Sequence, residues 1–382
     1  MLRSEIESRS RMLARPRVVH LVPKLLEGGA EALVRSLCAR LPAEGVDVTV
    51  VSVYPSGLDA ARKSLLGVPV IEIGRRGRGD VQYFPRLVRT LRDLQPDIVH
   101  AHLHTGQYGG RLAAILAGIG TMVLTIHGEE PGGPLRATID RVLHARTARF
   151  IVFTETQRKD VSEREHVSLE RIVVIPNGIA RPAHLTSREG SRRDLGLPPD
   201  AVLMYAPARL SRVKNQCLAI GALSRVIAQN RKEVHLVIAG AGPDDAALRA
   251  LAHELGLAGR VHFLGFRSDA ASLGQAMDIF VLPSLSERMP LALGEAMMNG
   301  LIPVSTPWRG VGEFLEDGST GCISTGFGAE QFAAAMLRAL EIHASSDPMQ
   351  ERVRLYGRAR FDLAEMVSRH AGLYRALAGA IA

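Results

Sequence analysis

The pattern of hydrophobic and polar residues changes its period repeatedly along the chain. Short runs of β-branched and other apolar residues, typical of buried strands, alternate with longer segments whose apolar residues recur at helical spacing. In the first half the predicted strands are Arg17–Leu21, Val46–Val53, Pro69–Ile73, Ile98–Ala101, Met122–Ile126, Phe150–Phe153 and Ile172–Ile175. In the second half they are Val202–Ala206, Val234–Ala239, Val261–Leu264, Ile279–Leu282, Pro303–Ser305 and Gly321–Ile323. This alternation predicts an α/β fold with two doubly wound parallel sheets, each carrying helices on both faces.

A change of composition separates the two halves. Residues 175–200, IPNGIARPAHLTSREGSRRDLGLPPD, are rich in proline, glycine, serine and charge and have no period, which is typical of an interdomain linker. We place the boundary near residue 182, which predicts two Rossmann-like domains, 1–182 and 183–363. A chain of 382 residues suits two domains of roughly 150–200 residues each. Residues 364–382 contain a predicted amphipathic helix, which we expect to pack back on the N-terminal domain.

The composition narrows the class of protein. With 46% hydrophobic and 23% charged residues, the chain reads as a soluble globular enzyme and not as a disordered or fibrous protein. Three single cysteines, Cys38, Cys217 and Cys322, argue against a disulfide framework and against a CxxC-type metal site. No apolar run reaches the roughly 18–20 residues that span a bilayer, and the first residues lack the apolar core of a signal peptide. The sequence therefore predicts a cytoplasmic protein.

The positive charge is concentrated in the first half. Residues 1–182 hold 26 Lys+Arg against 19 Asp+Glu, a net +7, which leaves +1 of the total +8 for the rest. The densest cluster, residues 75–78, precedes a predicted helix with a basic face of Arg86, Arg89 and Arg92. Two interpretations stay open: a surface helix packed on a sheet, or peripheral docking to an anionic membrane surface. Nucleic-acid binding would rest on net charge alone, and we do not expect it.

Two cations follow the first strand of the second half. Arg209 and Lys214 lie in the loop after that strand and ahead of a helix, where ligands of open parallel sheets collect. The planar fork of arginine and the point charge of lysine can together neutralise a diphosphate without a metal. Solvated loop charges are the alternative interpretation.

Two carboxylates follow a later strand. Glu287 and Glu295 are separated by seven residues, and Pro290 and Leu291 between them resemble the start of a helix. If the helix begins there, Glu287 lies in the preceding loop and Glu295 in the first turns, and each can accept hydrogen bonds from vicinal hydroxyl groups. Ordinary surface composition is the alternative interpretation.

A pair of glycines follows the first strand of the chain. Gly28 and Gly29 open a predicted helix whose free N–H groups are suited to a phosphate or a carboxylate. The segment is not the dinucleotide motif GxGxxG, because the third glycine is missing, and residues 240–245 lack it as well. A plain turn is the alternative for Gly28 and Gly29, and a nicotinamide dehydrogenase is disfavoured.

Taken in order, these motifs resemble the retaining GT-B glycosyltransferases of family 4, also called glycosyl transferases group 1. The resemblance covers most of the chain and rests on residues 28–31, 97–102, 126–128, 175–179, 209–214, 240–243, 263–266, 278–280, 287–295 and 316–321. It implies that residues 1–182 bind the acceptor and residues 183–363 bind the nucleotide sugar. No cofactor and no essential metal are implied, only a UDP-sugar or GDP-sugar donor.

The resemblance also implies roles for individual residues. Arg209 and Lys214 would bind the donor diphosphate, Glu295 the ribose, and Glu287 the hydroxyl groups of the transferred sugar. Pro290 and Leu291 would flank the donor at the helix start, and Gly28 and Gly29 would approach the phosphate. His127 would orient the sugar or stabilise the transition state, although a satisfied core histidine is the alternative from the residue alone. The donor base would lie near Gly242, Phe266 and Arg267, and His100 and His102 would either line the acceptor side or be structural.

The reaction implied by the resemblance is transfer of a hexose with retention to a hydroxyl acceptor in polysaccharide, glycolipid or lipid-linked saccharide biosynthesis. The chain departs from the family pattern at Ala208, Ala180 and residues 307–313, and Trp308 in the last segment is expected to alter which sugar is accepted. No carboxylate pair is placed to act as nucleophile and acid, which favours a front-face route over double displacement. A nucleotide-sugar epimerase of GT-B type and a non-catalytic nucleotide-sugar-binding protein remain the alternatives.

Overall fold

The computed structural model describes residues 15–25, 29–55, 67–77, 79–128, 134–181, 187–229 and 232–380. The chain forms two compact units, Met1–Gly178 with Leu363–Ala382, and Ile179–Asp362. The boundary that we expected near residue 182 lies outside the described residues. The division falls at Gly178, because the Ile179 N–H donates to the Phe361 carbonyl at 3.0 Å and the Ile179 side chain is buried within the second unit.

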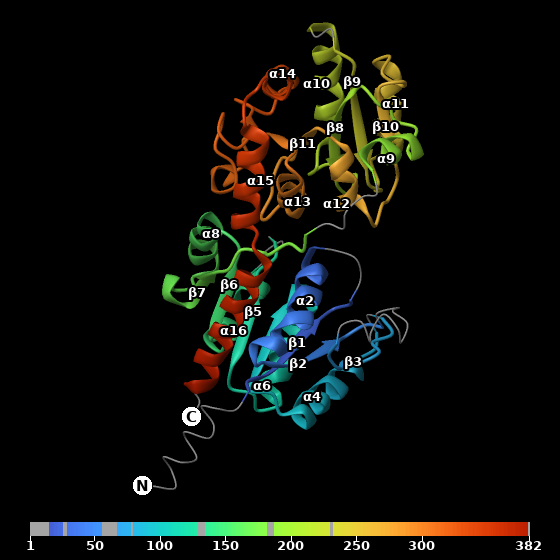
Figure 1. Cartoon of the computed structure of the whole chain (residues 1–382). Coiled ribbons are helices and arrows are strands. Elements are labelled where there is room, and N and C mark those ends of the chain that lie inside the picture. Colours follow the sequence, from blue (N-terminus) through green and yellow to red (C-terminus); the bar gives the residue numbers. More distant parts are fainter. Residues whose placement is uncertain are drawn as a thin grey trace. The chain divides into compact units, whose positions relative to one another are not determined.

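The first unit is built on a seven-stranded parallel sheet of order β3-β2-β1-β4-β5-β6-β7 (Figure 1). Its strands are β1 (Arg17–Val22), β2 (Asp47–Ser52), β3 (Val70–Glu72), β4 (Ile98–His102), β5 (Met122–Thr125), β6 (Arg149–Val152) and β7 (Ile172–Val174). Its helices are α2 (Gly29–Arg40), α4 (Tyr83–Leu94), α5 (Leu103–Thr105), α6 (Arg111–Leu116), α7 (Pro134–Ala145), α8 (Glu155–Glu165) and α16 (Leu363–Gly379). The order reverses between β1 and β4, which makes their carboxyl ends a switch point where ligands bind in such sheets.

The second unit is built on a six-stranded parallel sheet of order β10-β9-β8-β11-β12-β13. Its strands are β8 (Val202–Pro207), β9 (Val234–Ala239), β10 (Val261–Phe263), β11 (Ile279–Leu282), β12 (Ile302–Ser305) and β13 (Cys322–Ile323). Its helices are α9 (Arg188–Asp194), α10 (Gln216–Gln229), α11 (Asp245–Glu254), α12 (Ala270–Leu273), α13 (Leu291–Asn299), α14 (Ala329–Ala344) and α15 (Met349–Arg360). Here the switch point lies between β8 and β11. Every predicted strand is present in the two sheets, with each end within one residue of its predicted place.

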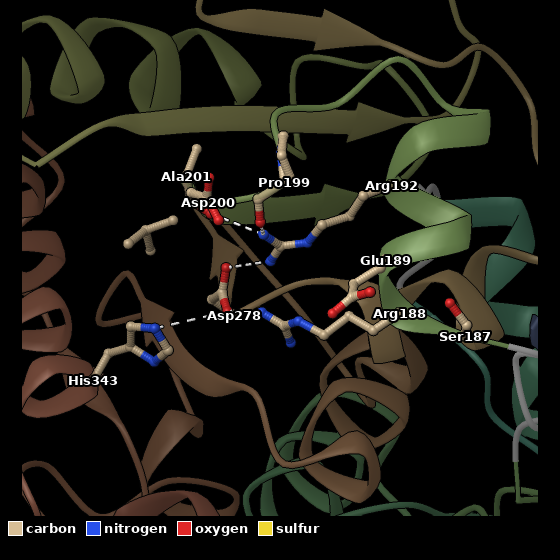
Figure 2. Close-up of a pocket in the computed structure, with 10 residues that line it drawn as sticks. Ser187, Arg188, Glu189, Arg192, Pro199, Asp200, Ala201, Asp278 and His343 are labelled. Carbon is tan, nitrogen blue, oxygen red and sulfur yellow. Dashed lines mark hydrogen bonds and ion pairs between the residues drawn. The ribbon is translucent and has the colours of Figure 1, made fainter.

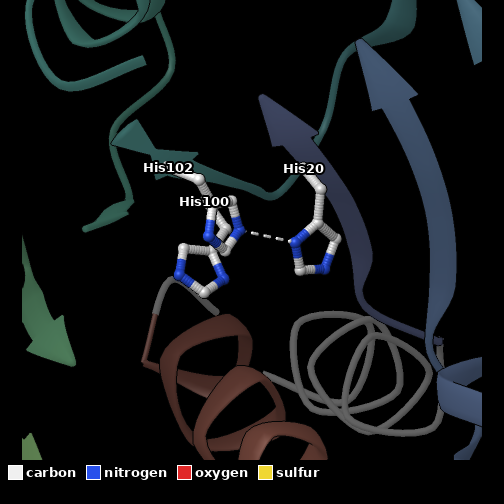
Figure 3. A group of neighbouring side chains, drawn as sticks. All are labelled: His20, His100 and His102. Atoms are coloured by element: carbon white, nitrogen blue, oxygen red, sulfur yellow. Dashed lines mark hydrogen bonds between the residues drawn. The ribbon is translucent and has the colours of Figure 1, made fainter. Parts of the chain in front are cut away.

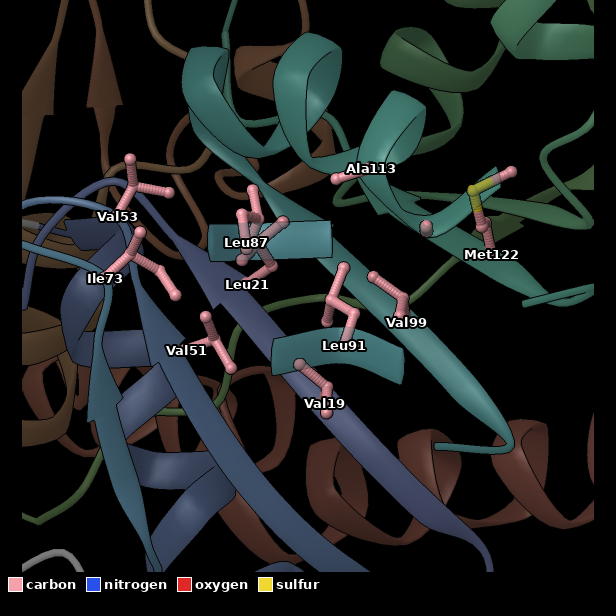
Figure 4. Packing of buried hydrophobic residues seen from close by; sticks show 11 residues of the cluster. Val19, Leu21, Val51, Val53, Ile73, Leu87, Leu91, Val99, Ala113 and Met122 are labelled. Carbon is pink, nitrogen blue, oxygen red and sulfur yellow. The ribbon is translucent and has the colours of Figure 1, made fainter. Parts of the chain in front are cut away.

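Helix α4 carries the basic face noted in the sequence, and its apolar face is covered. Leu87 and Leu91 are fully buried against residues of β1, β2 and β4 (Figure 4). This is the arrangement of a surface helix packed on a sheet, so its apolar face is not available for insertion into a membrane. Arg86, Arg89 and Arg92 on the other face are exposed. Arg78 of the preceding cluster lies outside the described residues.

Helix α16 belongs to the first unit although the second unit precedes it in the chain. Arg369 donates to the Val174 carbonyl at 2.7 Å, and Arg375 donates to the Glu44 carbonyl at 2.7 Å. Tyr374 is fully buried, and its hydroxyl group lies 2.6 Å from Nδ1 of His100 on β4. The first unit is therefore completed by a segment from the far end of the chain.

Candidate functional site

The predicted cations and carboxylates follow neighbouring strands of the second sheet. Arg209 and Lys214 lie in the loop after β8, and Glu287 lies in the loop after β11. Strands β8 and β11 are paired in parallel at the switch point of this sheet. Both loops therefore leave the carboxyl edge side by side, which is where open α/β sheets bind their ligands.

Lys214 and Glu287 form an ion pair. The Lys214 ammonium group donates to both carboxylate oxygens of Glu287, at 2.7 Å and 3.0 Å, and the hydroxyl group of buried Ser284 donates to one of them at 2.6 Å. The Glu287 side chain is 7% exposed and that of Lys214 is 28% exposed. The family resemblance implies that these two residues bind different parts of a donor, which stays a prediction, and the structure shows that the two side chains pair with each other.

The backbone holds the two loops together. The Leu285 N–H donates to the Val213 carbonyl at 2.9 Å, and the Asn215 side-chain amide donates to the Pro283 carbonyl at 3.1 Å. Asn215 has a positive φ of 53°, a conformation that asparagine adopts more readily than most residues. This turn ends the loop directly before α10 begins at Gln216.

Arg209 stands apart from that network. Its carbonyl group accepts a hydrogen bond from the Gln216 side chain at 3.1 Å, which fixes its backbone. The guanidinium group is exposed and forms no hydrogen bond or ion pair with any residue that the structure describes. The protein thus presents a cationic fork that is available to an anion.

Helix α13 begins at Leu291, directly after Pro290, where the sequence predicts its start. Among the described residues no side chain caps this end, so no capping group occupies the first backbone N–H groups of the helix, which follows the loop that holds Glu287. Glu295 lies in the second turn and is largely buried, and this burial raises its pKa from 4.5 to about 7. Its charge in turn raises the pKa of Tyr205 on β8, after the larger effect of burial. A carboxyl group with a pKa near 7 can donate a hydrogen bond to a hydroxyl group when it is protonated and accept one when it is ionised.

Gly242 is required by packing. A Cβ atom at Gly242 would lie 2.0 Å from the Leu210 carbonyl oxygen, and one at Gly240 would lie 1.9 Å from that of Ala208. The loops after β8 and β9 can approach this closely only because these residues are glycines. Phe266 is 63% exposed, and Arg267 pairs with Asp269 at 2.7 Å. The donor-base role of Gly242, Phe266 and Arg267 stays a prediction.

The remaining candidates belong to the first unit. Gly28 lies outside the described residues, and Gly29 begins α2. His127 follows β5, and its Nε2 lies 3.3 Å from Nδ1 of His102. His100 and His102 are fully buried, which excludes them from the acceptor side of a site and leaves the structural alternative. His20 on β1 belongs to the same group, and no pattern in the sequence indicates this, because only the pairing of β1 with β4 brings it there.

The expectation for Trp308 is wrong. Its side chain is 2% exposed, its ring lies 5.6 Å from that of Phe314, and its indole N–H donates to the Ser305 hydroxyl group at 3.1 Å. A side chain buried in this way stabilises the second unit and cannot contact a sugar. Its place after a strand gave no sign of this burial.

A pocket of about 510 Å³ opens at the opposite edge of the second sheet, at the amino ends of β8 and β11 (Figure 2). Arg188 and Arg192 of α9 both point at Asp278, and His343 faces it from α14. Arg192 donates to Asp278 at 2.7 Å and also to three backbone carbonyl groups. Asp278 accepts from the Leu203 N–H at 2.8 Å as well, so these charges tie α9 to the sheet.

Two family models match successive parts of the chain. Glycosyltransferase Family 4 matches residues 27–181, and Glycosyl transferases group 1 matches residues 187–360. The chain belongs to the family 4 glycosyltransferases of the GT-B fold. Among curated relatives, D-inositol 3-phosphate glycosyltransferase of Mycobacterium ulcerans (strain Agy99) is 29% identical over 63% of this chain and 55% of the relative. A UDP-Gal:alpha-D-GlcNAc-diphosphoundecaprenol alpha-1,3-galactosyltransferase of Escherichia coli is 30% identical over 58% of this chain and 60% of the relative.

Solved GT-B structures share the fold along nearly the whole chain. Anabaena HepE in complex with UDP and glucose matches with a TM-score of 0.79 and 22% identity, covering 94% of this chain and 99% of that one. A glycosyltransferase from Rickettsia africae ESF-5 matches with a TM-score of 0.82 and 17% identity, covering 95% and 98%. The chain spans just over half the length of the first curated relatives that it matches. Among the described helices of this family member, none is long and apolar enough to cross a bilayer.

Proposed function

We propose that the protein is a retaining glycosyltransferase that moves a sugar from a nucleotide diphosphate sugar to a hydroxyl acceptor. The observation that carries the proposal is that the exposed Arg209 fork and the Lys214–Glu287 pair lie in the two loops that follow β8 and β11, at the switch point of the second sheet and ahead of the uncapped start of α13. A leaving nucleoside diphosphate needs compensation of its growing negative charge. Two cations and free N–H groups supply that compensation without a metal.

Each member of this group has a role in the proposed reaction. Arg209 binds the diphosphate with its two-pronged fork. Lys214 keeps a third ammonium hydrogen for a phosphate oxygen while it holds Glu287 with the other two. Glu287 accepts hydrogen bonds from hydroxyl groups of the transferred sugar, and Glu295 exchanges hydrogen bonds with the ribose.

Retention follows from a front-face route in this proposal. Both oxygens of Glu287 are engaged by Lys214, and one is also bonded to Ser284, so this carboxylate is poorly suited to act as a nucleophile. The leaving phosphate deprotonates the acceptor hydroxyl group on the same face of the sugar. Arg209, Lys214 and the start of α13 stabilise the charge that develops.

For the substrates we propose a UDP-sugar or GDP-sugar donor and an acceptor of polysaccharide, glycolipid or lipid-linked saccharide assembly. The relatives support this range, since one is named for a UDP-galactose donor with a diphosphoundecaprenol acceptor and another was solved with UDP. We also propose a cytoplasmic location with peripheral association at an anionic bilayer. The exposed arginines of α4 and the excess positive charge of the first half support it.

A donor panel tests the proposal. The full chain is incubated with UDP- and GDP-sugars, with and without a lipid extract of bacterial membranes, and nucleotide release is measured. Arg209→Gln is compared with Arg212→Gln, an exposed arginine of the same loop. We expect acceptor-dependent release that falls roughly 100- to 1,000-fold in Arg209→Gln and persists in the control.

Other outcomes separate the alternatives. An isomerised donor sugar formed without acceptor would identify an epimerase. Donor binding with no release under any condition would identify a non-catalytic binding protein. Arg209 is a sharper test than Lys214, because replacing Lys214 also removes the partner of the buried Glu287 carboxylate.

A further inference from the structure

Three histidines of the first unit lie together in its interior. His20 on β1 pairs in register with His100 on β4, and His102 lies two residues farther along β4 (Figure 3). All three side chains are fully buried. Their ring nitrogens approach within 4.8 Å of one another, but both nitrogens of His100 are bonded to hydroxyl groups, those of Tyr374 and Thr125. The group is therefore a hydrogen-bonded network and not a set of converging free lone pairs.

Part of this network is a chain of imidazole rings that ends at His127. Nδ1 of His20 lies 2.9 Å from Nε2 of His102, and Nδ1 of His102 lies 3.3 Å from Nε2 of His127. Nε2 of His20, at the inner end, is buried and has no partner among the described residues. Nδ1 of His127, at the outer end, has none there either, but it is not a fully buried atom.

Burial keeps these rings neutral. It lowers the pKa of His20 to about 3 and that of His127 to about 4, and it lowers the pKa of His102 well below its ordinary value. A neutral imidazole has one N–H donor and one acceptor nitrogen. Because each link needs one hydrogen, the three rings have two arrangements, in which all the protons point outward or all point inward.

The two arrangements differ at the ends of the chain. With the protons pointing inward, His20 carries a buried N–H donor on Nε2 that has no acceptor among the described residues. With the protons pointing outward, that nitrogen is a bare acceptor and the terminal N–H group is on Nδ1 of His127, where it can reach a ligand or water. Buried N–H groups without a partner are rarer than unpaired buried acceptors, and such a donor is disfavoured roughly tenfold or more in population.

We propose that His20 and His102 are positioning residues that hold His127 in its Nδ1–H tautomer, so that His127 offers a hydrogen-bond donor at the carboxyl edge of the first sheet. The use of this donor rests on the proposed function, in which it would stabilise a developing negative charge on the donor substrate. The tautomer itself does not depend on turnover.

Nuclear magnetic resonance measures the tautomer directly. The full chain is labelled with ¹⁵N-histidine, two-bond ¹H–¹⁵N correlations are recorded near pH 7, and His127→Gln identifies the His127 signals. We expect a protonated Nδ1 and an unprotonated Nε2 for His127 in the wild type. A protonated Nε2 overturns the proposal, and so does a ring that exchanges equally between both tautomers.

Matched substitutions test the role of the chain. His102→Asn can place an amide donor near the position of Nδ1 and is expected to keep the His127 tautomer, whereas His102→Leu removes the donor and is expected to give a mixture. With an active donor and acceptor pair, His102→Leu should lower kcat at nearly unchanged KM by roughly tenfold or more, and His102→Asn should restore much of it. Equal spectra for the two variants would overturn the positioning role.

The NMR spectrum tests the tautomer of His127, and the activity assay tests the proposed function, so the two proposals can fail independently. A wild type that shows the Nδ1–H tautomer but has no transferase activity contradicts the proposed function and leaves this inference standing. An active wild type with the other tautomer does the reverse. The wild-type spectrum decides the tautomer even if a substituted protein fails to fold.

Discussion

Glu295 makes the stability of the second unit depend on pH. Burial raises its pKa from 4.5 to about 7, so the folded protein binds this proton more tightly than the unfolded chain. Stability is therefore lost as the pH rises from about 4.5 to about 7. The difference between these two pKa values corresponds to about 3 kcal/mol at 1.36 kcal/mol for each pKa unit. This is the cost of keeping an ionised carboxylate in a largely buried place.

Replacing Glu295 by glutamine removes that cost. The stability advantage of Glu295→Gln over the wild type should increase by roughly 2–3 kcal/mol from pH 5 to pH 8. For a unit of this size, this increase corresponds to about 5–10 °C in Tm. Differential scanning calorimetry at both pH values measures the gain, and it should resolve the second unit if the two units unfold separately. The exposed Glu330, in the first turn of α14, provides the control substitution Glu330→Gln, which makes the same chemical change at a carboxylate that is not buried.

A difference between Glu295→Gln and the wild type that stays constant from pH 5 to pH 8 would refute this reasoning. The substitution should also weaken donor binding if the carboxylate holds the ribose. A stabilised variant with impaired binding would show that the group is kept for its interaction with the ligand and at the expense of stability.

Three further predictions concern the same unit. Lys214→Ala should lower the free energy of unfolding by roughly 2 kcal/mol in urea denaturation, because it leaves Glu287 as a buried carboxylate without its cation. The double variant Lys214→Ala with Glu287→Gln should recover part of that loss. If the effects of the two single substitutions simply add in the double variant, the pairing is contradicted. Gly242→Ala should destabilise the protein by roughly 1–3 kcal/mol, since its Cβ atom would lie 2.0 Å from a backbone oxygen, whereas Gly259→Ala, with nothing within 4 Å, should be nearly neutral in the same assay. EDTA should leave nucleotide release unchanged if Arg209 and Lys214 suffice for the diphosphate, and a loss that Mg²⁺ restores would contradict this.

The sequence predicts the fold well because parallel strands buried on both faces are continuous apolar runs. This pattern places each strand end to within one residue. The alternation of strands and helices then determines the class of fold, and the start of α13 follows from Pro290, whose fixed φ suits the start of a helix.

The contacts within the site could not be predicted in the same way. Lys214 and Glu287 meet because β8 and β11, which are not consecutive in the chain, are neighbours in the sheet. His20 joins His102 for the same reason in the other sheet, through the pairing of β1 with β4. Pairing of this kind depends on the order of strands, which the hydrophobic pattern does not encode. The burial of Trp308 is equally hidden in the sequence, because a single buried residue after a strand has no periodic signal.

Because α16 belongs to the first unit, it determines the order in which the two units can complete their folding during synthesis. Domains usually fold as they leave the ribosome, the N-terminal one first. Here β4 and the buried ring of His100 lack Tyr374 until residues beyond the whole second unit have been made. The synthesis of the first unit therefore begins before that of the second unit but ends after it. A fragment that stops at Asp362 contains the whole second sheet, whereas its first unit lacks α16.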